Sequence, residues 1–107
     1  MNIFITGENG FIGRNLAERM KQYAEMNLIS GTLSAGSQNM VYHKAGEPCV
    51  YSNDVATWKE FFLKNNINVV IHNAASVGTD VVALEPIKST STNVAGTYNI
   101  CLSLIHI

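Results

Sequence analysis

The sequence carries little charge, and the two signs nearly cancel. Seven lysines and arginines stand against eight aspartates and glutamates in 107 residues, for a formal net charge of −1. No basic stripe is present, which argues against nucleic acid as the main partner. The apolar runs fall short of the ~20 residues of a membrane-spanning helix, and no basic segment leads into an apolar one as in a secretory signal. We therefore expect neither a nucleic-acid nor a membrane partner.

Cysteine is also scarce. Cys49 and Cys101 are the only two, and they do not form a Cys-x-x-Cys pair. Two such isolated cysteines predict ordinary reduced thiols in a cytoplasmic protein, with neither a disulfide nor a metal site. A chain of this length forms one domain or part of one.

The N-terminal segment is the most informative part of the chain, because an apolar strand at Asn2–Thr6 runs directly into Gly7, Gly10 and Gly13. An amphipathic stretch typical of a helix follows, from Phe11 to about Ala24. A strand, a glycine turn and a helix in this order can hold the pyrophosphate of a dinucleotide, since the helix N-terminus offers N–H groups and a positive dipole end. Taken alone, the segment also fits a glycine turn without any nucleotide.

Short apolar runs alternate with longer stretches of helical periodicity along the whole chain. This alternation predicts an α/β fold: a doubly wound parallel sheet of the Rossmann type, incomplete, with about four strands and flanking helices. Thr57 and Glu60 have the spacing of a capping box, which predicts a helix beginning after Thr57. Residues 74–84 are expected to form a loop or an irregular turn. The predicted elements are strands at Asn2–Thr6, Asn27–Thr32, Cys49–Tyr51 and Asn68–His72, a further candidate strand at Met40–Tyr42, and helices at Phe11–Ala24, from Trp58 to Asn65-Asn66, and at Pro86–Leu104.

The residues that follow the strands are candidate site residues, because ligands of such sheets bind beyond the carboxyl ends of the strands. Asp54 and Val55 follow one predicted strand, and Asn73, Ala74 and Ala75 follow another. Small residues at these places would let a flat ligand lie close to the backbone. Asp54 is equally typical of a turn or a helix entry, and simple packing is the alternative for the two alanines.

Asn93 is unusual because it stands inside the last predicted helix, where asparagine competes with the helix for hydrogen bonds. A polar contact to a neighbouring strand or to a ligand would explain it, and so would a helix cap. His72, at the end of a predicted strand, is expected to have a structural role.

Together these segments resemble the extended short-chain dehydrogenase/reductase family, in its nucleotide-sugar epimerase and dehydratase group. The resemblance covers about Asn2 to Cys101, with the motifs in the family's order and spacing. It implies that residues 1–107 are the N-terminal part of an NAD(P)-binding Rossmann domain, without the substrate-binding part. The motifs are Thr6-Gly7-x-x-Gly10-x-x-Gly13, Asp54-Val55, Val70-Ile71-His72-Asn73-Ala74-Ala75 and Asn93-Val94-x-Gly96-Thr97-x-Asn99-Ile100.

The resemblance also implies a role for each motif. The three glycines, with the backbone of Phe11 and Ile12, would cradle the pyrophosphate of the cofactor. Asp54 and Val55 would bracket the adenine, with the carboxylate accepting a hydrogen bond from its amino group. The segment Asn73–Ala75 would line the adenosine and ribose side of the cleft.

The choice between NAD and NADP stays open. NAD-preferring members carry an acidic residue about 20 residues beyond the glycines, and that place falls near Gly31-Thr32, where no acid stands. The missing carboxylate favours NADP, yet no Arg or Lys occurs between Lys21 and Lys44 to pair with a 2′-phosphate. Thr32 and the neighbouring serines could hydrogen-bond that phosphate instead.

Asn93, by the same resemblance, would hold the central strands and the helix in register beside the cofactor. The whole enzyme would be an NAD(P)-dependent epimerase, dehydratase or reductase acting on a nucleotide sugar or related secondary alcohol. Such enzymes often dimerise through helices, so the resemblance allows a homodimer, and the oligomeric state stays open. Their reaction needs a Tyr that transfers a proton and a Lys four residues on. No such pair occurs: four residues after Tyr23, Tyr42, Tyr51 and Tyr98 stand Asn27, Gly46, Val55 and Leu102.

This absence leaves two interpretations. Either the chain is the cofactor-binding portion of an enzyme and is catalytically silent alone, or it is a non-catalytic NAD(P)-binding module. The segment Cys101–Ile107 bears on the same question, because it is apolar and β-branched where the family usually continues an Ala- and Glu-rich helix. It fits either a buried helix end or a truncated or chimeric reading frame.

Overall fold

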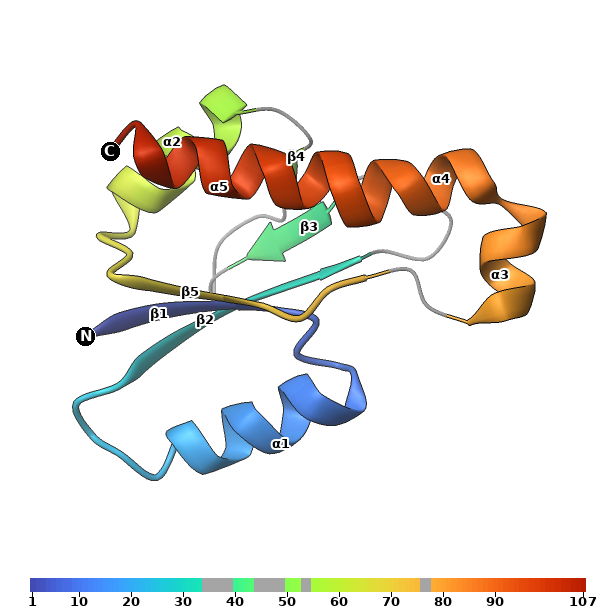
Figure 1. Cartoon of the computed structure of the whole chain (residues 1–107). Coiled ribbons are helices and arrows are strands. Elements are labelled where there is room, and N and C mark those ends of the chain that lie inside the picture. The colour runs from blue at the N-terminus through green and yellow to red at the C-terminus, as the bar shows by residue number, and fades with distance from the viewer. Residues whose placement is uncertain (34–39, 44–49, 53–54, 76–77) are drawn as a thin grey trace.

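The computed structural model describes residues 1–33, 40–43, 50–52, 55–75 and 78–107, and it places a five-stranded sheet between two layers of helices. Helix α1 covers one face, while α2 and the long C-terminal helix lie on the other (Figure 1). The elements are β1 (Asn2–Thr6), α1 (Phe11–Met20), β2 (Asn27–Leu33), β3 (Met40–His43), β4 (Val50–Ser52), α2 (Val55–Lys64), β5 (Val69–His72), α3 (Thr79–Leu84), α4 (Pro86–Thr90), the π-helical segment Ser91–Gly96 and α5 (Thr97–Ile105).

The strand order is β4-β3-β2-β1-β5, and only its β2-β1-β5 part has parallel neighbours. The predicted incomplete α/β sheet with parallel strands and flanking helices is confirmed, but the direction of β3 differs, because β3 pairs antiparallel with both β2 and β4. The physical reason is length: residues 34–39 and 44–49 are too few for a parallel crossover, which needs a dozen or more residues. Because two reversals cancel, β4 again runs in the direction of β1. The carboxyl ends of β1, β2, β4 and β5 therefore share one edge.

The core lies between the sheet and α2. Phe4, in the middle of β1, is fully buried against three aromatic side chains of α2. Its ring centroid lies 5.6 Å from that of Trp58 and 4.9 Å from that of Phe61, and Trp58 stacks on Phe62 at 5.5 Å. Truncating such a buried ring to Ala costs about 3–5 kcal/mol of folding stability, so each ring contributes several kcal/mol to that stability. This cluster fixes the carboxyl edge of β1 relative to the helices.

Helix α2 begins three residues earlier than predicted. Its first residue is Val55, so Thr57 lies inside the first turn and the predicted capping box is wrong. The Val55 carbonyl instead accepts a hydrogen bond from Ser103 Oγ on α5, at 3.0 Å. The end is as expected: the helix stops at Lys64, and Asn66 takes a left-handed φ of 50°.

The C-terminal third of the chain is more helical than predicted. Residues 79–84, expected as loop, form α3, whereas Pro86 begins a helix as expected. That helix runs to Ile105 and contains a π-helical segment at Ser91–Gly96. Helix α1 is shorter than predicted and ends at Met20 instead of Ala24. Across the residues that the structure describes, no helix has the combined length and apolar character needed to cross a membrane.

Candidate functional site

The glycine turn after β1 depends on Gly7. This residue has a φ of 72°, in the left-handed region that side chains other than glycine rarely adopt. A Cβ added to it would lie 2.9 Å from the backbone nitrogen of Ala74 and 3.0 Å from the carbonyl carbon of Asn73. The turn is closed by a 3.1 Å hydrogen bond from the Gly10 N–H to the Gly7 carbonyl. Gly7 therefore brings the segment after β5 into backbone contact with the turn after β1.

Gly13 has a different role, since it sets how closely α1 approaches the turn. It is buried, and a Cβ there would overlap the Gly7 carbonyl and lie 2.9 Å from the Glu8 Cα. Gly10 is exposed, and an added Cβ would meet only the Gly7 oxygen, at 3.3 Å. Space for a ligand thus lies beside Gly10.

The N-terminus of α1 opens toward that space. Gly10 precedes the helix and offers no side-chain cap, and the side chains of Phe11 and Ile12 are 79% and 65% exposed. The first backbone N–H groups of a helix have no acceptor inside it, and the dipole there favours an anion. A phosphate beside Gly10 would meet these N–H groups directly.

A hydrogen-bonded relay holds the ends of β1 and β5 together. The fully buried Thr6 hydroxyl lies 2.7 Å from His72 Nδ1 and accepts the Ala74 N–H at 3.1 Å. On the other side of the ring, His72 Nε2 lies 2.9 Å from Thr97 Oγ1, which donates to the Asn93 carbonyl at 2.7 Å. The relay joins two strands, the segment after β5 and the C-terminal helix.

Donor and acceptor counting assigns the proton of this ring. The Thr97 hydroxyl has one hydrogen and gives it to Asn93, so it must accept from an Nε2–H. A neutral ring then leaves Nδ1 as an acceptor for the Thr6 hydroxyl. Burial also lowers the pKa of His72 below its ordinary value of 6.5, which favours the same neutral form. The structural role expected for His72 thus consists of its hydrogen bonds to Thr6 and Thr97.

Asn73 follows His72 in the chain and differs from the residues of this relay, in which every polar group has a partner. Among the residues that the structure describes, its buried side-chain Nδ2 has no hydrogen-bond partner, an arrangement that costs about 1–3 kcal/mol when nothing pairs with it. Ala74 is half-buried against the core cluster, and Ala75 is exposed. The segment therefore combines small side chains with one unpaired amide donor, beside the glycine turn.

The predicted site residues are only partly brought together. Gly7, Gly13, Asn73 and Ala74 meet in one place. Asn93 lies within the π-helical segment, its carbonyl bonded to Thr97. Asp54 lies outside the described residues, and Thr32 is placed only by its backbone in β2. Val55 begins α2 and contacts α5.

The site residues that sequence reasoning missed are Thr6 and Thr97. Each lies within one of the motifs, but the motif alone predicts no role for its hydroxyl. Their bonds to His72 span 66 and 25 residues, so local spacing could not reveal them. The available signal was the coincidence of a strand-end histidine with a threonine in each flanking motif.

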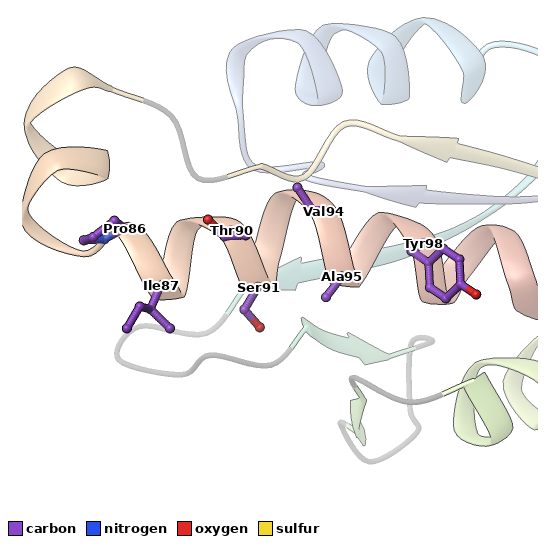
Figure 2. Close-up of a pocket in the computed structure, with 7 residues that line it drawn as sticks. All are labelled: Pro86, Ile87, Thr90, Ser91, Val94, Ala95 and Tyr98. Atoms are coloured by element: carbon purple, nitrogen blue, oxygen red, sulfur yellow. The ribbon is translucent and has the colours of Figure 1, made fainter.

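A second hollow lies on the outer side of the C-terminal helix, with a volume of about 720 Å³. Figure 2 shows that all of its lining side chains come from one helical stretch. Tyr98 is the only ionisable group among them, so these residues offer a pyrophosphate three hydroxyl groups but no positive charge. The lining residues are Pro86, Ile87, Thr90, Ser91, Val94, Ala95 and Tyr98.

A dinucleotide fits the carboxyl edge better than this hollow. At the edge, two glycine positions leave no room for a Cβ, a helix N-terminus faces open space, and one buried amide lacks a partner. These three features match the needs of a pyrophosphate and of the ribose beside it.

Solved structures with similar folds include nucleotide-sugar enzymes. A UDP-glucose 4-epimerase from Thermus thermophilus in complex with NAD matches with a TM-score of 0.75 and 20% identity, over 99% of this chain and 34% of that one. A dTDP-4-dehydrorhamnose reductase from Clostridium acetobutylicum gives 0.74 and 23%, over 99% and 32%. An L-threonine dehydrogenase from Clostridium difficile gives 0.63 and 24%, over 92% and 31%. At these identities the likeness establishes the Rossmann-like architecture.

The chain spans about a third of the length of each of these structures. A sequence comparison with curated proteins gave no match. The model of a protein family, described as the NAD dependent epimerase/dehydratase family, matches residues 3–105. Since this match covers nearly all of the described fold, the chain belongs to the NAD dependent epimerase/dehydratase family.

Proposed function

We propose that residues 1–107 bind NAD or NADP as the cofactor-binding portion of an epimerase, dehydratase or reductase. The observation that carries the proposal is the glycine cradle, where Gly7 and Gly13 leave no space for a Cβ and α1 points its N-terminus at the opening. The family's dependence on NAD supports the same cofactor class.

The residue roles follow from this geometry. Backbone N–H groups at Phe11, Ile12 and Gly13 would receive the pyrophosphate, and the unpaired Asn73 amide would donate to the nucleoside part of the cofactor. Asp54 with Val55 at the adenine stays a prediction from resemblance. When bound, the nicotinamide supplies hydride transfer, while this chain's residues hold and orient the cofactor.

The residues of β2 leave the choice between NAD and NADP open. No residue of Asn27–Leu33 is acidic, so a carboxylate to hold two ribose hydroxyls is missing from this strand. Thr32 is the nearest polar residue to that place in the sequence. Comparing affinities for NADH and NADPH would decide between the two.

The proposal extends to the substrate class of the whole enzyme. We infer a nucleotide sugar or a related secondary alcohol, because two of the three structures described above are nucleotide-sugar enzymes. No Tyr-x-x-x-Lys pair occurs in these residues, so the chain would bind cofactor without turning over substrate, and a non-catalytic NAD(P)-binding module is the second candidate. A cytoplasmic location stays a prediction from the cysteine pattern.

A homodimer is also kept as a proposal. The seven residues that line the second hollow carry no charged side chain. Two copies of the chain could therefore bury these residues against each other without leaving an unpaired charge. Sedimentation of the parent chain and of Ile87→Glu would test this: the variant should shift to monomer. A parent chain that is monomeric at high concentration would overturn the dimer.

Fluorescence titration with NADH and NADPH tests the proposed function. Gly13→Ala should weaken binding more than tenfold, because the new methyl group overlaps the Gly7 carbonyl and pushes α1 from the turn. Gly96→Ala is the matched control, since its added Cβ would lie an ordinary 3.6 Å from the Ser91 oxygen. Equal affinities of the parent and Gly13→Ala, or no binding by a folded parent chain, would contradict the proposal.

A further inference from the structure

The backbone after β5 is held by bonds that begin on other elements. The Ala74 N–H reaches the Thr6 hydroxyl, and the orientation of that hydroxyl is fixed by His72 Nδ1. The ring is in turn oriented by Thr97, 25 residues further along the chain. The same Ala74 nitrogen is the atom closest to the Cβ-free side of Gly7.

A neutral ring is the only form that satisfies every member of this relay. If Nδ1 carried a proton, it would point at the Thr6 oxygen, which already accepts from Ala74. The hydrogen of the fully buried Thr6 hydroxyl would then lose its acceptor. Protonation at His72 would therefore disturb the bond that holds Ala74.

We propose that His72 is a positioning residue for the cofactor edge: through Thr6 and Thr97, its neutral ring sets the Asn73–Ala75 backbone against the glycine turn. The proposal rests on the proposed function for its consequence, which is cofactor affinity. The structural part concerns the Ala74 N–H bond and can be measured without any cofactor.

Two substitutions of the same side chain separate the two halves of the relay. In His72→Asn, the amide stands near the place of Nδ1, so contact with Thr6 is kept and contact with Thr97 is lost. In His72→Gln, the amide reaches the place of Nε2, so Thr97 is kept and Thr6 is lost. Ala74 should lose its position in His72→Gln, whereas His72→Asn, which keeps the Thr6 contact, should loosen it only as far as loss of the Thr97 contact does.

Thr97→Val and Thr97→Ser form a gentler pair, because neither removes the ring. Valine has the shape of threonine but cannot accept the Nε2–H, whereas serine restores that acceptor. We expect Thr97→Val to raise the NADH Kd about threefold to tenfold and to speed hydrogen exchange at the Ala74 amide, with Thr97→Ser close to the parent chain.

Nitrogen-15 NMR of the full chain is the decisive readout. The parent His72 should show the Nε2–H neutral tautomer, and its Ala74 amide should be protected from exchange. A different tautomer, or an Ala74 amide whose exchange is unchanged by both His72→Gln and Thr97→Val, would overturn the proposal.

The pH profile adds a test that a purely structural role would not pass. The groups that contact the ring, Thr6 from β1 and Thr97 from α5, are uncharged, and burial is the cause of its lowered pKa. NADH affinity of the parent should fall as His72 becomes protonated, and His72→Asn should lose that step. A step that persists in His72→Asn would refute the positioning role. If the folded parent binds neither NADH nor NADPH, the proposed function fails, while the tautomer and exchange data still decide the positioning of Ala74.

Discussion

The parallel strands β2, β1 and β5 have their amino ends at one edge of the sheet and their carboxyl ends at the other, and asparagine side chains are paired differently at the two edges. At the amino edge, the asparagine side chains pair with one another and with the backbone: Asn2 Nδ2 donates to the Asn65 carbonyl, Asn27 Nδ2 to Asn2 Oδ1, and the Asn2 N–H to Asn68 Oδ1. At the carboxyl edge, Asn73 is half-buried, and its buried Nδ2 has no partner among the described residues. Asparagine side chains are therefore hydrogen-bonded at the amino edge, whereas an asparagine donor lacks a partner at the carboxyl edge.

We infer from this contrast that the paired asparagines are structural and that Asn73 is the one proposed to contact the cofactor. Asparagines that are paired hold strand ends in register, and a helix-ending asparagine, Asn66, even supplies the left-handed turn there. An amide left without a partner costs stability unless something else pairs with it. The amino edge is therefore complete as it stands, whereas the carboxyl edge has a donor available for a ligand.

The largest expected effect is at the left-handed residues of the two edges. Gly7→Ala forces a side chain into a φ of 72° and against the Ala74 nitrogen, so we expect a loss of at least about 1–2 kcal/mol in unfolding free energy and no measurable NADH binding. Asn66→Gly, at a φ of 50°, should leave the affinity unchanged. Urea unfolding and NADH titration of both variants check this. Strong binding by Gly7→Ala would break the contrast.

The next effect is at Asn2. Asn2→Ala removes two donated bonds and the acceptor of Asn27, so unfolding free energy should fall by about 1–3 kcal/mol. The NADH Kd, measured below the unfolding midpoint, should stay that of the parent. A raised Kd would mean that the amino edge also shapes the binding site.

Asn73→Ala should behave in the opposite manner. Because Nδ2 has no partner, its loss should leave unfolding free energy within about 0.5 kcal/mol or raise it. Affinity for NADH should fall about tenfold, through the loss of one hydrogen bond to the cofactor. Calorimetric melting and titration compare the two quantities directly, and a variant that is destabilised yet binds normally would assign Asn73 to structure.

The smallest effect is the pH dependence of folding. Since the pKa of His72 is lowered in the folded state, the unfolded chain takes up this proton at higher pH than the folded chain does. The stabilising contribution is present above about 6.5 and is lost as pH falls through the folded pKa. Urea unfolding of the parent and of His72→Asn across this range should show a slope that only the parent has.

Features that depend only on residues close together in the chain could be predicted from the sequence. The order of strand, glycine turn and helix is local, so β1, Gly7 and the start of α1 were found. The direction of β3 was missed because apolar patterning does not encode strand direction, whereas the short connections do. The start of α2 was missed because packing of the Phe4 cluster and the Ser103 bond to Val55 outweighed a local capping pattern.

The candidate site shows the same limit. Its glycines could be found from spacing, but the relay through Thr6, His72 and Thr97 joins residues far apart in the chain. Such contacts exist only once the sheet has brought the ends of β1 and β5 together. The unpaired donor on Asn73 is likewise a property of its surroundings, which no local pattern describes.

The π-helical segment determines which side chains of the last helix share a face. Pro86, Thr90, Val94 and Tyr98 repeat every four residues and line one hollow. At about 100° per residue, a regular α-helix would rotate each step by ~40° and spread the row around its circumference. The wider π turn absorbs that surplus. Deleting one residue within Ser91–Gly96 would thus turn the wide turn into regular α-helix, while Tyr98 and the residues after it would keep their place around the helix axis.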